Sequence, residues 1–226
     1  LMDKRVVDIF RPLWWLILNG PILTFRPSKS GKAYQKIWDK DNHGSPLRKF
    51  TINQTSKLKK IFESYKNISI EYAMRYGTPE IEKTLNKMTK KGCSKILLVP
   101  LYPQYAASTS ATVKDEVFKW MLKQRWQPDL RTIAPWFDNH YYIKALAQTV
   151  KKNIINKNKL DKLIVSFHGI PKRYFMAGDP YHCHCIKSAR LLKEELKWPD
   201  DKILVTFQSR FGPEPWLQPY TDETII

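Results

Sequence analysis

Acidic residues are scarce in this chain of 226 residues, which has 21 Asp and Glu against 39 Lys and Arg. The net charge of +18 attracts anions, so nucleic acid, an anionic membrane surface and an acidic small molecule are all candidate partners. A basic, solvated surface without any such partner is the simpler alternative. The chain also lacks an arginine-rich tail and a nucleic-acid-reading motif, so we do not expect it to bind nucleic acid.

The chain also lacks long apolar runs and an even number of cysteines that could all form pairs. No run approaches the roughly 18 apolar residues of a membrane-spanning helix, so we do not expect an integral membrane protein. The chain has three cysteines, two of which are almost adjacent (Cys183 and Cys185), and this argues against a disulfide scaffold. Cysteine usage therefore favours a reducing, intracellular compartment.

The two ends of the chain indicate that it is truncated. Leu1 stands where an initiating methionine would be, and no secretory signal pattern follows it. A helix start at Thr221 is followed by only a few residues up to Ile226, and a helix of one turn is not stable alone. We therefore expect the chain to be a part of a longer reading frame.

The apolar pattern predicts an α/β fold. Continuously apolar runs such as 96–99 are typical of parallel strands that are covered on both faces. Longer amphipathic stretches lie between the runs, which is the alternation of an α/β protein. Strands are predicted at residues 68–73, 95–101, 130–134, 162–167 and 202–207, and helices at 46–65, 79–90, 108–124, 139–155 and 180–196.

A polar stretch at residues 151–159 predicts a boundary between two domains. The first would comprise residues 1–150, and the second would begin at 160 and be incomplete at 226. Thr78-Pro79 and Asp179-Pro180 each predict a capping residue followed by proline at the first helical position.

His168 is the strongest candidate for chemistry, because it directly follows an apolar strand. Ligand sites of open α/β sheets lie beyond the carboxyl ends of the strands. A histidine there can accept a proton or bind a metal ion, and Gly169 leaves the backbone room to turn. The alternative is a histidine that only packs against the end of the strand.

Other predicted strands end in aromatic and basic residues. Tyr102 lies in a loop with two prolines, which suits stacking on a flat ligand, and Trp216 could form the wall of a cleft. Arg75 could pair with a ligand carboxylate. Core aromatics and a surface ion pair are the alternatives. Together the strand ends predict a cleft for a flat, apolar ligand that carries carboxylates.

Four segments resemble the ferrochelatase family: SFHGIPKRYFMAGDPYHCHC (166–185), TFQSRFGPEPWLQPYTDET (206–224), LYPQYAASTSATVKDE (101–116) and HGSPL (43–47). The resemblance implies two Rossmann-like domains with parallel sheets and a porphyrin in the cleft between them. It also implies insertion of ferrous iron into protoporphyrin IX to form protohaem, the last step of haem biosynthesis. The family's first strand and a catalytic glutamate have no match in this chain.

The resemblance also assigns roles to single residues. His168 matches the histidine that binds iron or accepts the pyrrole protons. Six further residues match substrate-contacting positions: Ser45, Arg75, Tyr76, Tyr102, Gln104 and Trp216. Iron is then a substrate. A chelatase for coproporphyrin or cobalt, and an inactive fragment that at most binds porphyrin, are the alternatives.

Residues 11–18 are short, apolar and rich in tryptophan. The matching region of the family forms a lip at the mouth of the cleft, so we expect peripheral contact with an anionic membrane. A core helix is the alternative.

The motif His182-Cys183-His184-Cys185 raises the question of a bound metal. Zinc sites have wider cysteine spacing and four ligands, and the family's 2Fe–2S cysteines lie beyond residue 226. On a helix, Cys185 shares a face with three apolar residues (Ala189, Leu192 and Leu196), which predicts that it belongs to the core. We expect no tightly bound cofactor.

Overall fold

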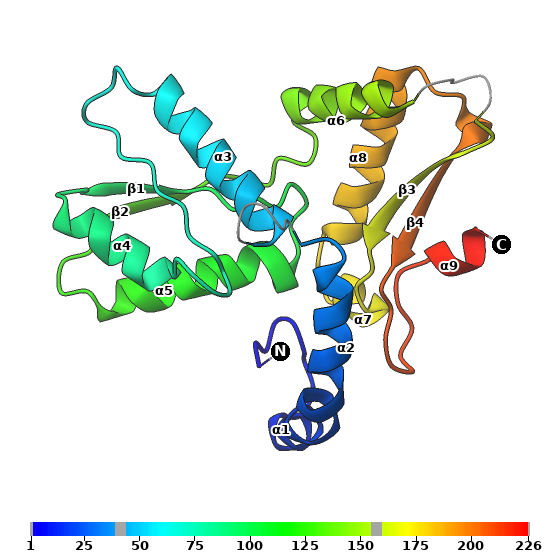
Figure 1. Cartoon of the computed structure of the whole chain (residues 1–226), viewed down its shortest axis with the longest axis horizontal. Helices are drawn as coiled ribbons and strands as arrows, with labels where there is room; N and C mark the ends of the chain where they lie inside the picture. Colours follow the sequence, from blue (N-terminus) through cyan, green and yellow to red (C-terminus); the bar gives the residue numbers. More distant parts are fainter. Residues whose placement is uncertain (1, 39–43, 155–159, 226) are drawn as a thin grey trace. The chain divides into compact units, whose positions relative to one another are not determined.

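The computed structural model describes residues 2–38, 44–154 and 160–225. Most of the predicted boundary at 151–159, His43, Leu1 and Ile226 lie outside these residues. The chain divides into two compact units (Figure 1). Unit 1 comprises Leu1–Leu98 and Thr112–Thr132, and unit 2 comprises Val99–Ala111 and Ile133–Ile226. The predicted domains, 1–150 and 160–226, stay a prediction.

Unit 1 contains a parallel pair of strands, β1 (Lys95–Leu98) and β2 (Asp129–Thr132). Helices α4 (Ile81–Lys90) and α5 (Thr112–Lys123) supply the core that packs against this pair. Its buried residues are Leu85, Ile96, Val117 and Trp120, and the Trp120 indole donates a hydrogen bond of 2.8 Å to Asn86 Oδ1. Leu97, on the other face of β1, is 62% exposed. The prediction that both faces are covered is therefore wrong for β1 within the described residues.

The predicted strand at 68–73 does not form. Of the neighbouring residues, only Met74 makes a β-bridge, to Glu80. A strand needs the backbone groups of a neighbouring strand, and no described segment offers them here. The segment is instead anchored by Glu71, whose carboxylate meets three lysines: Lys59, Lys87 and Lys91.

Four further helical segments lie among the described residues of unit 1. They are α1 (Arg11–Ile17), η1 (Leu18–Ile22), α2 (Leu23–Gln35) and α3 (Pro46–Ile61). Trp14 and Leu18 are buried in a small cluster with Val7, whereas the neighbouring Leu16 is 62% exposed. The apolar segment 11–18 is thus a core element on one face and an exposed apolar surface on the other. No helix within 2–38, 44–154 and 160–225 is long and apolar enough to cross a membrane.

Unit 2 is built on the parallel pair β3 (Leu163–His168) and β4 (Ile203–Gln208), in register from Leu163–Ile203 to His168–Gln208. Unit 2 also contains the helices α6 (His140–Asn153), α7 (Lys172–Met176) and α8 (Tyr181–Leu196). The packing of α8 against α6 buries Ala147, Leu192 and Leu196, as the apolar face of α8 predicts. Two short helical segments among the described residues also belong to unit 2: the π-helix η2 (Ala107–Ala111) and the 3-10 helix η4 (Asp200–Lys202).

Two predicted helix starts differ from the structure. Helix α4 begins at Ile81 with Glu80 as its cap, two residues after the predicted Thr78-Pro79 start. Helix α8 begins at Tyr181, and Pro180 rather than Asp179 is its cap. The short helix α9 (Thr221–Thr224) is held by tertiary contacts: Thr221 Oγ1 donates to the buried Thr206 Oγ1 at 2.8 Å.

Candidate functional site

The carboxyl ends of β3 and β4 form the best candidate site in unit 2. His168 is the last residue of β3 and lies opposite Gln208, the last residue of β4. Both residues are exposed, whereas Phe167 before His168 is half-buried and Phe207 before Gln208 is buried. The parallel pairing therefore places an imidazole at the carboxyl ends of the strands, where α/β proteins bind ligands.

A backbone contact defines the hydrogen position on the His168 ring. Its Nδ1 lies 2.7 Å from the carbonyl oxygen of Gly169. A carbonyl only accepts hydrogen bonds, so Nδ1 carries the hydrogen and donates it. In the neutral ring Nε2 then has a free lone pair, which can accept a proton or bind a metal ion.

Gly169 is required by close packing around this histidine. Its N–H donates to the Gln208 carbonyl at 2.7 Å, which extends the β3–β4 pairing by one residue. A Cβ at this position would lie 3.0 Å from that carbonyl oxygen and 3.2 Å from Cε3 of Trp216. Any larger residue would therefore displace either the strand end or the tryptophan.

Trp216 packs against the segment that follows His168. It is 5% exposed, its indole N–H donates to the Phe211 carbonyl at 3.0 Å, and it makes a β-bridge with Pro171. Leu217 N–H also donates to the Ile170 carbonyl at 3.0 Å. The loop after β4 is thus fixed onto the loop after β3.

We expect Gly169→Ala to lower the free energy of unfolding by about 1–3 kcal/mol, because the added methyl would crowd both the Gln208 carbonyl oxygen and the Trp216 ring. Urea denaturation followed by tryptophan fluorescence measures the loss. Gly31→Ala is the matched control: its Cβ meets no atom within 4 Å, and alanine favours the helix by up to about 1 kcal/mol. Equal stability of both variants would contradict the packing argument.

The loop with Tyr102 and Gln104 is anchored to the rest of unit 2. The backbone and indole N–H groups of Trp136 donate to the carbonyls of Pro103 and Pro100, at 3.1 and 3.2 Å. Gln104 Nε2 donates to Ser188 Oγ at 2.9 Å, and the buried Ser188 hydroxyl donates in turn to the Phe137 carbonyl. Tyr102 remains 40% exposed.

His184 and Asp179 complete this anchoring, which the sequence did not indicate. His184 Nδ1 accepts a hydrogen bond from Tyr105 N–H at 3.2 Å, and its ring stacks on Phe137 at 3.7 Å. Burial lowers the pKa of His184, so the neutral ring that this bond needs is favoured. The carboxylate of Asp179 accepts from Ala107 N–H at 2.7 Å and from Tyr181 N–H at 3.0 Å.

Asp179→Asn should destabilise the protein by about 1–3 kcal/mol, because an amide NH₂ would face one of these two backbone donors. Asp138→Asn is the control, since Asp138 forms an exposed ion pair with Lys187 and its loss should cost less than about 1 kcal/mol. Urea denaturation compares the two variants. A larger loss for Asp138→Asn would contradict the anchoring role of Asp179.

The His182-Cys183-His184-Cys185 motif is distributed over different environments. His182 packs between Phe175 and Phe207. His184 accepts the hydrogen bond from Tyr105 N–H. Cys185 is fully buried, which confirms its predicted place in the core, and burial raises the pKa of its thiol to about 12. Among the described residues, no three His, Cys, Asp or Glu side chains are grouped so that they could hold a metal ion.

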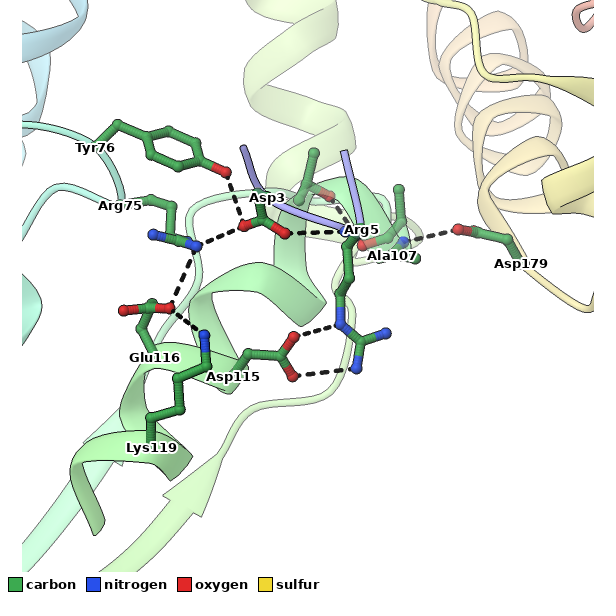
Figure 2. A network of polar contacts seen from close by, with 11 residues as sticks. Asp3, Arg5, Arg75, Tyr76, Ala107, Asp115, Glu116, Lys119 and Asp179 are labelled. Carbon is green, nitrogen blue, oxygen red and sulfur yellow. Dashed lines mark hydrogen bonds and ion pairs between the residues drawn. The ribbon is translucent and has the colours of Figure 1, made fainter. Parts of the chain in front are cut away.

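The other predicted site residues lie in unit 1. Ser45 caps α3, and its Oγ accepts from Arg48 N–H at 3.3 Å. Arg75 and Tyr76 are adjacent, with the guanidinium 4.4 Å above the tyrosine ring. Both contact Asp3, a residue that the sequence analysis did not single out (Figure 2). The structure thus brings together Arg75 with Tyr76, and His168 with the surroundings of Trp216.

Comparison with known proteins identifies the relatives of this chain. The family model described as Ferrochelatase matches residues 1–226. Ferrochelatases of Allorhizobium ampelinum and Rhizobium meliloti are 53% and 51% identical over 226 residues. These matches cover 100% of this chain and 66% and 67% of the two relatives, so the chain spans about two thirds of their length.

A solved structure supports the fold. SirB from Bacillus subtilis with Fe3+ matches with a TM-score of 0.52 and 19% identity, over 76% of this chain and 65% of that chain. At this identity the likeness concerns the fold alone. It confirms the predicted α/β fold class.

Proposed function

Because the chain belongs to the ferrochelatase family, we propose that the protein inserts ferrous iron into protoporphyrin IX and so forms protohaem. The observation that carries this proposal is the His168 ring, which is exposed at the carboxyl end of β3 with Nδ1 2.7 Å from the Gly169 carbonyl oxygen, so that the neutral ring has its lone pair on Nε2. Iron enters as a substrate, and the two pyrrole N–H protons leave as it binds.

His168 would take one of these protons at Nε2. The Gly169 carbonyl holds the hydrogen on Nδ1 and would stabilise the charged ring that forms when Nε2 is protonated. One imidazole accepts one proton at a time, so the second proton needs a further acceptor. Deprotonation at Nε2 resets the site for the next turnover.

The anchored loop would supply binding energy for the porphyrin. A porphyrin nitrogen exposes its lone pair when the macrocycle bends, and a rigid rim can stabilise the bent form. Trp136 bonds to two carbonyls of the loop, and Ser188 holds the Gln104 side chain. We propose that Tyr102, Gln104 and Trp216 contact the porphyrin, as do three residues of unit 1: Ser45, Arg75 and Tyr76.

His168→Ala tests the proposal. We expect it to abolish insertion of ferrous iron while protoporphyrin binding stays within about twofold, because the imidazole acts on the proton rather than on the rim contacts. Absorbance of the metalled product measures insertion, and fluorescence quenching measures binding. His140→Ala, an exposed histidine on α6, is the control and should retain activity. Normal turnover by His168→Ala would refute the assignment, and turnover with cobalt or coproporphyrin alone would favour a different chelatase.

We also propose a cytoplasmic protein that touches anionic membranes with residues 11–18, which suits a poorly soluble substrate. Leu13, Trp15 and Leu16 are 51%, 53% and 62% exposed, on a chain of net charge +18. Exposed tryptophan favours the membrane interface, and basic charge adds attraction to anionic lipid.

Flotation with vesicles of anionic phospholipid tests this contact. The double variant Trp15→Ser, Leu16→Ser should float at least about fivefold less than the unchanged protein, because two exposed apolar anchors are lost. Leu122→Ser is the control, since Leu122 is 82% exposed on α5, outside the segment. Equal flotation of all three proteins, or none of the unchanged protein, would count against the proposal.

A further inference from the structure

Asp3 lies at the centre of a polar network in unit 1 (Figure 2). Its Oδ2 accepts a hydrogen bond from Arg75 Nη2 at 2.5 Å and another from the Tyr76 hydroxyl at 3.1 Å. Its Oδ1 accepts from Arg5 N–H at 2.9 Å. The Asp3 side chain is 13% exposed, so these contacts form with little access to water.

The charge of Arg75 is already balanced within the protein. Its Nη2 also meets Glu116 at 3.4 Å, and Glu116 pairs in turn with Lys119 at 2.9 Å. Arg75 Nε is buried and has no hydrogen-bond partner in the part of the chain that the structure describes. A guanidinium that faces two carboxylates attracts a further carboxylate weakly, so Arg75 is better suited to orient its neighbours than to capture an anion.

Hydrogen bonds, a buried side chain and an ion pair fix the backbone around Asp3. Its carbonyl accepts from Val6 and Val7 N–H, and Val7 is buried against Trp14 and Leu18. Arg5 forms an ion pair with Asp115 of α5. The carboxylate is therefore held in place by its own segment, independently of Arg75 and Tyr76.

We propose that Asp3 is a positioning residue, which fixes the Tyr76 hydroxyl and the Arg75 guanidinium in the orientation that a bound tetrapyrrole meets. This inference rests on the proposed function. The rival view is that Asp3 occupies the place of a substrate carboxylate and must be displaced. Positioning predicts that removing its charge weakens porphyrin binding, whereas displacement predicts that it strengthens binding.

The titration of Tyr76 supports the same geometry. Burial raises the pKa of the phenol, the Arg75 charge acts against this, and the Asp3 carboxylate adds to the rise. For Asp3 itself burial acts to raise the pKa, but the hydrogen bonds of Arg5 and Tyr76 and the Arg75 charge outweigh it and lower the pKa. Asp3 is therefore ionised at neutral pH and accepts the phenol hydrogen.

Asp3→Asn is compared with Glu82→Gln, because each replaces one paired carboxylate of unit 1 by an amide. Asp3 contacts Arg75 and Tyr76, whereas Glu82 lies outside this network and pairs with Lys123. We expect Asp3→Asn to bind protoporphyrin IX about tenfold more weakly in fluorescence quenching, and Glu82→Gln to stay within about twofold. Ultraviolet titration, with Tyr76→Phe as the reference, should show a lower Tyr76 pKa in Asp3→Asn only.

A double variant separates positioning from a general loss of structure. If Asp3 acts through the Tyr76 hydroxyl, the effect of Asp3→Asn on affinity should be smaller in the Tyr76→Phe background, and circular dichroism should be unchanged. Unchanged or tighter binding by Asp3→Asn, an additive double variant, or an unfolded Asp3→Asn protein would each overturn the positioning role. Failure of the unchanged protein to take up protoporphyrin would instead overturn the proposed function itself.

Discussion

The parallel pairing of β3 with β4 is the interaction on which the candidate site depends. The register pairs Leu163 with Ile203 and His168 with Gln208, so both strands end at the same side of the sheet. The Gly169 N–H then bonds to Gln208, and this leaves the Gly169 carbonyl next to the imidazole. The orientation of the His168 ring and the position of its hydrogen thus follow from the backbone hydrogen bonds between β3 and β4. They also depend on Gly169, which leaves room for the Trp216 ring.

A second constraint is that carboxylates with little exposure to water hold neighbouring segments in place. In unit 2, Asp179 uses its carboxylate on two backbone N–H groups. In unit 1, Asp3 uses its carboxylate on Arg75 and Tyr76. Partly or fully buried carboxylates must be paired, so each of them holds loops that carry proposed substrate contacts. Rigidity of this kind is what a site needs if binding energy is to bend a macrocycle.

Much of the fold followed from local pattern. The predicted strands at 162–167 and 202–207 correspond to β3 and β4, and the predicted helix at 180–196 corresponds to α8 within one residue. The strand at 68–73 failed because its apolar pattern says nothing about a partner, and Glu71 anchors it through side chains instead. For the site, His168 and Gly169 were recognisable from their place after a strand, whereas Asp3 carried no local signal.

The amino-acid order alone decided the strands β3 and β4, the helix α8 with Cys185 on its apolar face, and the place of His168 after a strand. These depend on residues close together in the chain, whose spacing is visible in the sequence. The tertiary structure alone decided that Asp3 meets Arg75, 72 residues away, that His184 accepts from Tyr105, and which nitrogen of His168 stays free. Those contacts depend on how distant segments pack, and no local pattern records that.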